Sequence, residues 1–258
     1  TTISITEDID ASFDKIKNFV DSYNELVEDI NTKLLEKQYR DFPPLTADQR
    51  ESMSEKDIEL WEEKAMSGLL RNDAVLQRMV YNMRAALNDN VDGSDIRLSD
   101  IGITTGKWYE HGKLYIDEEK LKKALAEDPD KVMQLFSKTD GSSYSPDADA
   151  GARAQRYRNV GLAHRISDIL NDNIRTTRDK NNKKGLLLER AGISGDTTEF
   201  KNVMNDQLSE LDKRIDRMTE MLMRKEESYW RQFTAMEKAI QSMNSQSIWL
   251  AQQLNMGM

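Results

Sequence analysis

The feature that most constrains the fold of this chain is a long amphipathic pattern near its C-terminus. Between Thr198 and Leu254 there is neither glycine nor proline, so no residue in this stretch is a strong helix breaker. Apolar residues recur there at alternating spacings of four and three, which is typical of a coiled-coil seam. At about 1.5 Å per residue, the predicted helix is roughly 85 Å long, which favours a structural rod over a small globular domain. The best-formed part of this seam consists of Leu208, Leu211, Ile215, Met218 and Leu222.

The end of this helix differs in composition from its beginning. Charges of both signs alternate from Glu199 to Lys238, whereas residues 239–258 carry no charged side chain. A membrane span is not predicted, because Gln, Ser and Asn interrupt the apolar residues throughout. An uncharged helix can pack beside copies of itself without repulsion, which favours an assembly segment, and a frayed, solvated terminus is the alternative. The apolar residues of the candidate assembly segment are Ile240, Met243, Trp249, Leu250 and Leu254.

A second seam with the same spacing lies near the N-terminus. Each apolar stripe needs a partner, so the two long helices are expected to pack together as an antiparallel pair. Pro43 and Pro44 are expected to end the first helix. Residues 1–5 resemble the end of a strand from an upstream domain. The N-terminal seam consists of Ile9, Phe13, Ile16, Val20, Tyr23, Val27, Ile30 and Leu34.

Residues 97–136 carry a different pattern. Short β-type runs at 97–105 and 113–117 flank a turn with Gly106 and Gly112, and two helices follow, the second beginning at Pro129 behind an Asp128 cap. The predicted fold is therefore mainly α: a long antiparallel coiled-coil or helical-bundle stalk with a small β-hairpin-plus-helix unit. The stalk is predicted to span residues 6–238. The hairpin unit is expected to bury Ile101, Ile103, Leu114, Leu121, Leu125 and Phe136.

Three shorter helices and one linker are also expected. The helices lie between Ser54 and Met66, from Asp73 onward, and at about 160–175, each with apolar residues along one side. Residues 137–152 are rich in Ser, Asp and Gly, which predicts a polar linker.

The residue types argue against a chemical function. A formal net charge of −9 gives no basic surface for nucleic acid, and the absence of cysteine excludes thiol catalysis and thiolate metal sites. His111 and His164 are the only histidines, and neither lies in a metal-binding motif. The many acidic residues are interleaved with Lys and Arg, which is typical of solvated helix faces. We therefore predict no catalytic residue, no cofactor and no metal ligand, and a protein that is not an enzyme.

Five stretches in order along the chain resemble one family. The segment QFTAMEKAIQSMNSQSIWLAQQL (232–254) is similar to the C-terminal end of the bacterial flagellar filament-capping proteins, also called hook-associated protein 2. The other stretches agree in order: FDKIKNFVDSYNELVEDIN (13–31), PLTADQRESMSEKDIELWEEKAMSGLLRND (44–73), LSDIGITT with GKLYIDEEKL (98–121), and GLAHRISDIL (161–170).

The resemblance implies a structural role outside the cell. Members of this family are exported through the flagellar type III channel without a cleaved signal and form a ring, usually of five or six subunits, at the distal tip. Their coiled-coil legs help exported flagellin to fold and insert, and the cap prevents its leakage. The partners implied are copies of the chain itself, flagellin, neighbouring axial proteins and an export chaperone at the C-terminal segment; some relatives adhere to host surfaces. A terminal helix that completes the stalk and the head domains would lie in the family's N-terminal part, and the terminal segments are flexible until assembled.

One alternative of another class remains open. A soluble helical adaptor or export chaperone would use the same seam to bind a partner helix. Such a protein is expected to form a stoichiometric complex with a client, whereas a cap protein forms rings.

Overall fold

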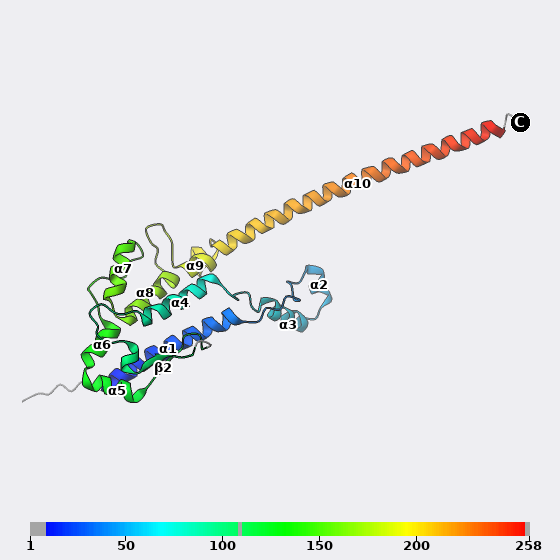
Figure 1. The fold of residues 1–258 in the computed structure, drawn as a ribbon. Helices are drawn as coiled ribbons and strands as arrows, with labels where there is room; N and C mark the ends of the chain where they lie inside the picture. The colour runs from blue at the N-terminus through cyan, green and yellow to red at the C-terminus, as the bar shows by residue number, and fades with distance from the viewer. Residues whose placement is uncertain (1–8, 108–109, 256–258) are drawn as a thin grey trace, which may run out of the picture. The chain divides into compact units, whose positions relative to one another are not determined.

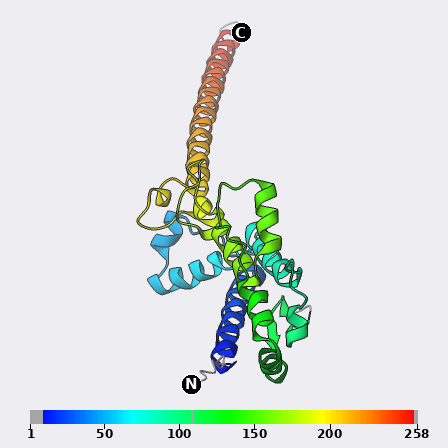
Figure 2. The same cartoon turned by 90° about the vertical axis from the view of Figure 1, so that its left-hand side faces the viewer.

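The computed structural model describes residues 9–107 and 110–255. The chain forms two compact units, Thr1–Leu188 and Glu189–Met258, called unit 1 and unit 2 below. Figure 1 shows the helices and strands of each unit, and Figure 2 shows the same elements turned by 90°. The strand end expected at residues 1–5 lies outside the described residues.

Unit 1 contains most of the secondary structure. Its two strands form one antiparallel sheet, with Thr104 opposite Tyr115. The elements of the chain, in order, are α1 (Ile9–Leu35), α2 (Ala47–Ser52), α3 (Glu55–Met66), α4 (Ala74–Asn88), the 3-10 helix η1 (Leu98–Ile101), β1 (Ile103–Thr105), β2 (Leu114–Ile116), α5 (Glu118–Glu127), α6 (Pro129–Ser137), α7 (Ala150–Asn159), α8 (Leu162–Ile174), α9 (Leu186–Ala191), the 3-10 helix η3 (Thr197–Glu199) and α10 (Val203–Asn255).

The core of unit 1 is built around α1. Its apolar stripe packs on α4, α5 and β2, and Phe19 meets Phe136 of α6 edge to face at 5.7 Å between ring centroids. The stripe is covered by its own unit, so the predicted pairing with the C-terminal helix is wrong on this side. Heptad spacing predicts that one face of a helix is buried. A globular core can bury that face as well as a second long helix can. Its buried members are Phe13, Ile16, Val20, Tyr23, Val27, Ile30 and Leu34, with Ile9 half-buried beside them.

The predicted hairpin is confirmed, and it lies against α1. All six residues expected to face inward from this part of the chain are buried. The side-chain amide of Asn24 on α1 binds the outer edge of β2 twice. Its Oδ1 accepts from the Leu114 N–H and its Nδ2 donates to the Leu114 carbonyl, both at 2.8 Å. The hairpin is thereby fixed to the helix through backbone as well as side-chain contacts.

Several helix starts agree with the sequence. The Asp128 side chain caps α6 at Lys131, with Pro129 in the first turn, and Ser54 caps α3 at Asp57. The end of α1 differs from the prediction. The last residue of the helix is Leu35, well before Pro43. There the chain is held by the segment after α3: Asn72 N–H donates to the Leu34 carbonyl at 3.2 Å.

Two further differences concern α7 and α10. The stretch expected to be a linker ends in α7, which is capped by Asp149 and contains no buried residue. The long helix begins at Val203, and Asp196 caps the short η3 turn that precedes it. Asn202 then precedes α10, with its Oδ1 accepting from Asn205 N–H at 2.8 Å. The predicted fold class, mainly α with a small hairpin, is confirmed.

Candidate interaction surfaces

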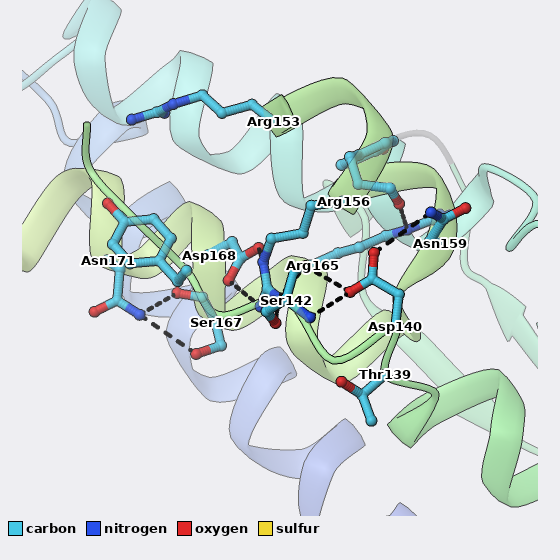
Figure 3. Close-up of polar contacts among 12 residues, drawn as sticks. Thr139, Asp140, Ser142, Arg153, Arg156, Asn159, Arg165, Ser167, Asp168 and Asn171 are labelled. Carbon is cyan, nitrogen blue, oxygen red and sulfur yellow. Dashed lines mark hydrogen bonds and ion pairs between the residues drawn. The ribbon is translucent and has the colours of Figure 1, made fainter. Parts of the chain in front are cut away.

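The densest polar cluster of unit 1 joins α7, α8 and the loop before them (Figure 3). Arg156 binds the Asp168 carboxylate in bidentate fashion, at 2.6 and 3.0 Å, and this bond raises the pKa of the guanidinium. A single nitrogen of Arg153, Nη1, donates to both carboxylate oxygens of Asp172, at 3.1 and 3.2 Å. Both carboxylates are therefore occupied by arginines and are not placed as a general acid and base.

Arg165 of α8 is the largest buried side chain in this cluster and is only 1% exposed. Its guanidinium donates to five backbone carbonyls and stacks 4.5 Å from the Tyr157 ring centroid. These carbonyls lie at the C-terminal ends of α4 and α7, where helices leave acceptors unpaired. Burial lowers the pKa of Arg165, and the acceptors around it hold the charged form. The five carbonyls are those of Ala86, Asp89, Asn90, Tyr157 and Arg158.

A cavity of about 190 Å³ lies beside this cluster, lined in part by Tyr144, Ala152 and Ile169. The Tyr144 hydroxyl donates to Asp172 at 2.7 Å, and burial together with this bond raises its pKa. Among the described residues, no buried side-chain nitrogen or oxygen lacks a hydrogen-bond partner. These contacts connect α7, α8 and the loop before α7, so the cluster stabilises the fold of unit 1.

The two histidines lie on different elements. The backbone carbonyl of His111, at the hairpin turn, accepts from Asn31 at 3.5 Å, and His164 is half-buried on α8. Within residues 9–107 and 110–255, no group of three or more His, Asp or Glu side chains is arranged to hold a metal ion.

The long helix α10 offers a different kind of surface. Its 53 residues include an apolar stripe, and among the described residues of unit 2 no other helix covers that stripe. The side chains of this stripe from Leu208 to Leu250 are half exposed or more, from 50% at Ile240 to 66% at Met243. Leucine and isoleucine at such exposure are a free apolar face rather than a core. The stripe contains the predicted seam residues Leu208, Leu211, Ile215, Met218 and Leu222.

The candidate assembly segment continues this helix. α10 runs through it to Asn255, and Ile240, Met243, Trp249 and Leu250 are each at least 50% exposed. The side chain of Leu254 lies outside the described residues. In the part of the chain that the structure describes, no helix is both long enough and apolar enough to cross a membrane.

These features define a class of protein: a helical structural protein with one globular unit and one long helix whose apolar stripe is open for a partner. Comparison with known proteins then gives the family. The family model for the C-terminus of flagellar hook-associated protein 2 matches residues 1–245, and the chain belongs to this family.

Curated relatives agree with this assignment. A flagellar hook-associated protein 2 from Halalkalibacterium halodurans is 38% identical over 252 residues, covering 95% of this chain and 45% of the relative. The protein of the same name from Thermotoga maritima is 29% identical, over 98% of this chain and 35% of the relative. The chain thus spans less than half the length of these relatives. A solved structure, the flagellar cap protein FliD D1-D2-D3 domains from Escherichia coli, matches 66% of this chain and 36% of that one, with a TM-score of 0.40 and 21% identity.

The sequence did not predict the structural roles of Arg165 and the Arg156–Asp168 pair, or the helix α7. A signal was present in the charge balance: residues 150–185 hold nine Lys and Arg against three Asp and Glu, in an otherwise acidic chain.

Proposed function

We propose that this chain is the leg part of a protein that caps the distal end of the bacterial flagellar filament. In this role it promotes the folding and insertion of exported flagellin and prevents its leakage. The observation that carries the proposal is the family match over residues 1–245, supported by 38% identity to a hook-associated protein 2 across 95% of the chain.

The division of the chain into two units suits a leg. Unit 1 has a core of its own and is a stiff body, whereas α10 is a helix of about 80 Å that presents apolar side chains along its length. An amphipathic helix of this kind is stable when a second helix covers its stripe. We place that second helix in the part of the family's length that this chain does not span, so that it completes a coiled-coil stalk with Leu208, Leu211 and Ile215.

The partners of the proposed cap follow from the same family. Copies of the protein form a ring, of five or six subunits, and flagellin and the neighbouring axial proteins are bound beneath it. The location is extracellular, at the flagellum tip, after export through the flagellar type III channel. An export chaperone that binds the C-terminal segment before export, and adhesion to host surfaces, are further proposed interactions.

The uncharged segment, 239–258, is proposed to be the part that orders on assembly. Its apolar residues can pack beside identical copies, because no charge repels them at close range. An isolated helix end frays first, since its last carbonyls have no intrahelical partner.

Complementation tests the proposal. A motile bacterium that lacks its own cap protein is given the full-length protein, and monomeric flagellin in the medium and filament length are scored. Restored filaments with little leaked flagellin are expected. Failure of the wild-type protein, or its recovery as a stoichiometric complex with one client and no rings, would support the adaptor alternative instead.

A matched pair of variants makes the test specific to the stripe. Ile215→Ser with Leu222→Ser removes two stripe residues and is expected to abolish capping. Asp216→Ser with Met223→Ser changes two residues one position further along the same helix and is expected to retain it. Equal activity of both variants would contradict a role for the stripe.

A further inference from the structure

The charge of unit 1 is unevenly distributed. The whole chain has a formal net charge of −9, yet residues 150–185 carry +6, and residues 1–149 carry −13, with nineteen Lys and Arg against thirty-two Asp and Glu. Both stretches belong to unit 1. The excess of basic residues in unit 1 is therefore concentrated in residues 150–185.

The positive surface centres on the loop from Arg175 to Gly185, called the basic loop below. The loop is fixed internally by Arg175, whose guanidinium donates to the carbonyls of Thr177 and Lys183 at 2.8 and 2.9 Å. Gly185 N–H donates to the Arg175 carbonyl at 2.8 Å and closes the base. The basic loop is thus held by its own backbone and by two arginines, since Arg178 Nη1 also donates to the Asn182 carbonyl at 2.8 Å.

The only acidic residue within the basic loop also serves this internal structure. The Asp179 carboxylate accepts from the N–H groups of Asn181 and Lys183, both at 2.8 Å, and these bonds lower its pKa. The nearby carboxylates are engaged as well: Asp147 accepts from Lys180 N–H at 2.9 Å, and Asp172 is bound by Arg153. The acids around the loop therefore help to order it, and Asp179 also feels the nearby charges of Arg175 and Lys183.

The side-chain ammonium groups of Lys180 and Lys183 are exposed and have no ion pair within the described residues. Two exposed apolar side chains flank them at the ends of the basic loop, Ile174 and Leu186, each 49% exposed. A small apolar contact surrounded by cations is a surface on which an acidic, partly apolar partner fits.

The negative surface is on α3. Glu55, Glu59 and Glu63 follow one another at spacings of four and lie along one face of this helix, called the acidic row below. All three are exposed, and none has an ion-pair partner within the described residues. Leu60, 50% exposed, and Met66, 62% exposed, lie on the same helix.

The acidic row and the basic loop of one chain are not paired with each other. Figure 1 shows α2 and α3 (light blue) projecting from unit 1, apart from α8 and the loop that follows it (yellow-green). Two surfaces that are complementary in charge and lie apart on one molecule can meet in a head-to-tail contact between copies, and such contacts give a ring where the rotation between neighbours closes.

We propose that the acidic row of one copy docks on the basic loop of a second copy of this chain. The proposal rests on the proposed function, in that the cap ring brings neighbouring legs side by side. Exposed ion pairs are individually weak. The contact therefore adds to assembly only where other contacts already hold the copies together and the effective concentration is high.

Charge reversal in the full-length protein tests this contact. The variant Glu55→Lys, Glu59→Lys, Glu63→Lys reverses the acidic row, and Lys180→Glu, Lys183→Glu reverses the basic loop. Each alone is expected to raise the dissociation constant of the ring about tenfold at low salt, measured by light scattering and native mass spectrometry. The two together are expected to restore assembly. In about 1 M salt, where the Debye length falls to about 3 Å, the differences are expected to vanish.

A matched control uses three exposed acids on α1 without ion pairs, Asp14→Lys, Asp21→Lys and Glu25→Lys, which make the same change in net charge. This control is expected to assemble as the wild type does. Rings that are unaffected by either reversal, or reversals that do not rescue each other, would overturn the proposed contact while leaving the cap function intact. Failure of the wild-type protein both to form rings and to complement would instead overturn the proposed function.

Discussion

The helices α1 and α10 carry the same heptad spacing but use it differently. In α1 the stripe is buried, with Val27 at 0% and Val20 at 2% exposure, because α4, α5 and β2 cover it. In α10 the corresponding residues are half exposed or more, from Met218 at 52% to Ile215 at 60%. A 4-3 spacing therefore defines a face that needs a partner, and the neighbouring elements decide whether that partner is a local core or another helix.

The largest difference between the two helices is expected from a buried charge. Ile16→Asp places a carboxylate in the core of unit 1 and is expected to cost about 4 kcal/mol or more of unfolding free energy. Leu211→Asp places the same group on a half-exposed face and is expected to cost less than about 1 kcal/mol in this chain. Urea unfolding of both variants measures the two values. Equal losses would show that the α10 stripe is covered already.

The second comparison is between the stability effects of a buried arginine in unit 1 and an exposed arginine on α10. Arg165→Gln leaves several buried carbonyls without a donor and is expected to destabilise unit 1 by about 3 kcal/mol. Arg217→Gln on α10 removes a hydrogen bond to the Lys213 carbonyl on an exposed face and is expected to cost under about 0.5 kcal/mol. Circular dichroism melts compare them. A melting temperature of Arg165→Gln close to that of the wild type would contradict the role given to its guanidinium.

A pH dependence of stability is expected from a buried tyrosine of α1. Burial raises the pKa of Tyr23 to about 12, from 10.0, so its neutral form is favoured in the folded state. This contribution is fully present below pH 10 and is lost as the pH rises from about 10 to about 12, by up to roughly 2.7 kcal/mol. Burial also raises the pKa of Tyr157 to about 12, which adds to the same loss.

Tyr23→Phe is therefore expected to flatten part of the alkaline decrease in stability, measured by urea unfolding at pH 9 to 12. Tyr229→Phe on α10 is the matched control and is expected to change nothing, because this ring is 57% exposed. An unchanged alkaline decrease in Tyr23→Phe would contradict the burial argument.

The smallest effect on stability is expected at the end of α10. Truncation after Lys238 removes a segment whose described side chains are exposed, so the melting temperature is expected to stay within about 2 °C. Amide hydrogen exchange is expected to be fast throughout 239–254 in the isolated chain, and truncation is expected to abolish capping in cells. Protection there equal to that around Leu211 would show a helix that is already docked.

Much of the fold followed from local patterns. Alternation and turn glycines predicted the hairpin, and the Asp128 and Ser54 caps predicted helix starts, because each depends on a few neighbouring residues. The helix α7 escaped detection because its sequence, AGARAQRYRN, lacks an apolar stripe and is held by polar contacts such as Arg156–Asp168. The partner of α1 could not be predicted, since it is set by elements far away in the sequence.

The candidate surfaces were also predictable only in part. The stripe of α10 and its uncharged end follow from spacing and composition alone. The roles of Arg165 and of the basic loop could not be predicted, because Arg165 reaches carbonyls as far away in the sequence as Ala86, and the loop depends on how Arg175 folds back on Thr177 and Lys183.

The amide of Asn24 has a consequence for how the protein avoids unwanted association. An exposed strand edge is a template on which a strand from another chain can add. By offering one acceptor and one donor to Leu114, the Asn24 side chain takes the place that a neighbouring strand would occupy beside β2. The outward backbone groups of Leu114 are therefore already paired within the chain, which opposes the joining of hairpins from crowded copies into a larger sheet across β2.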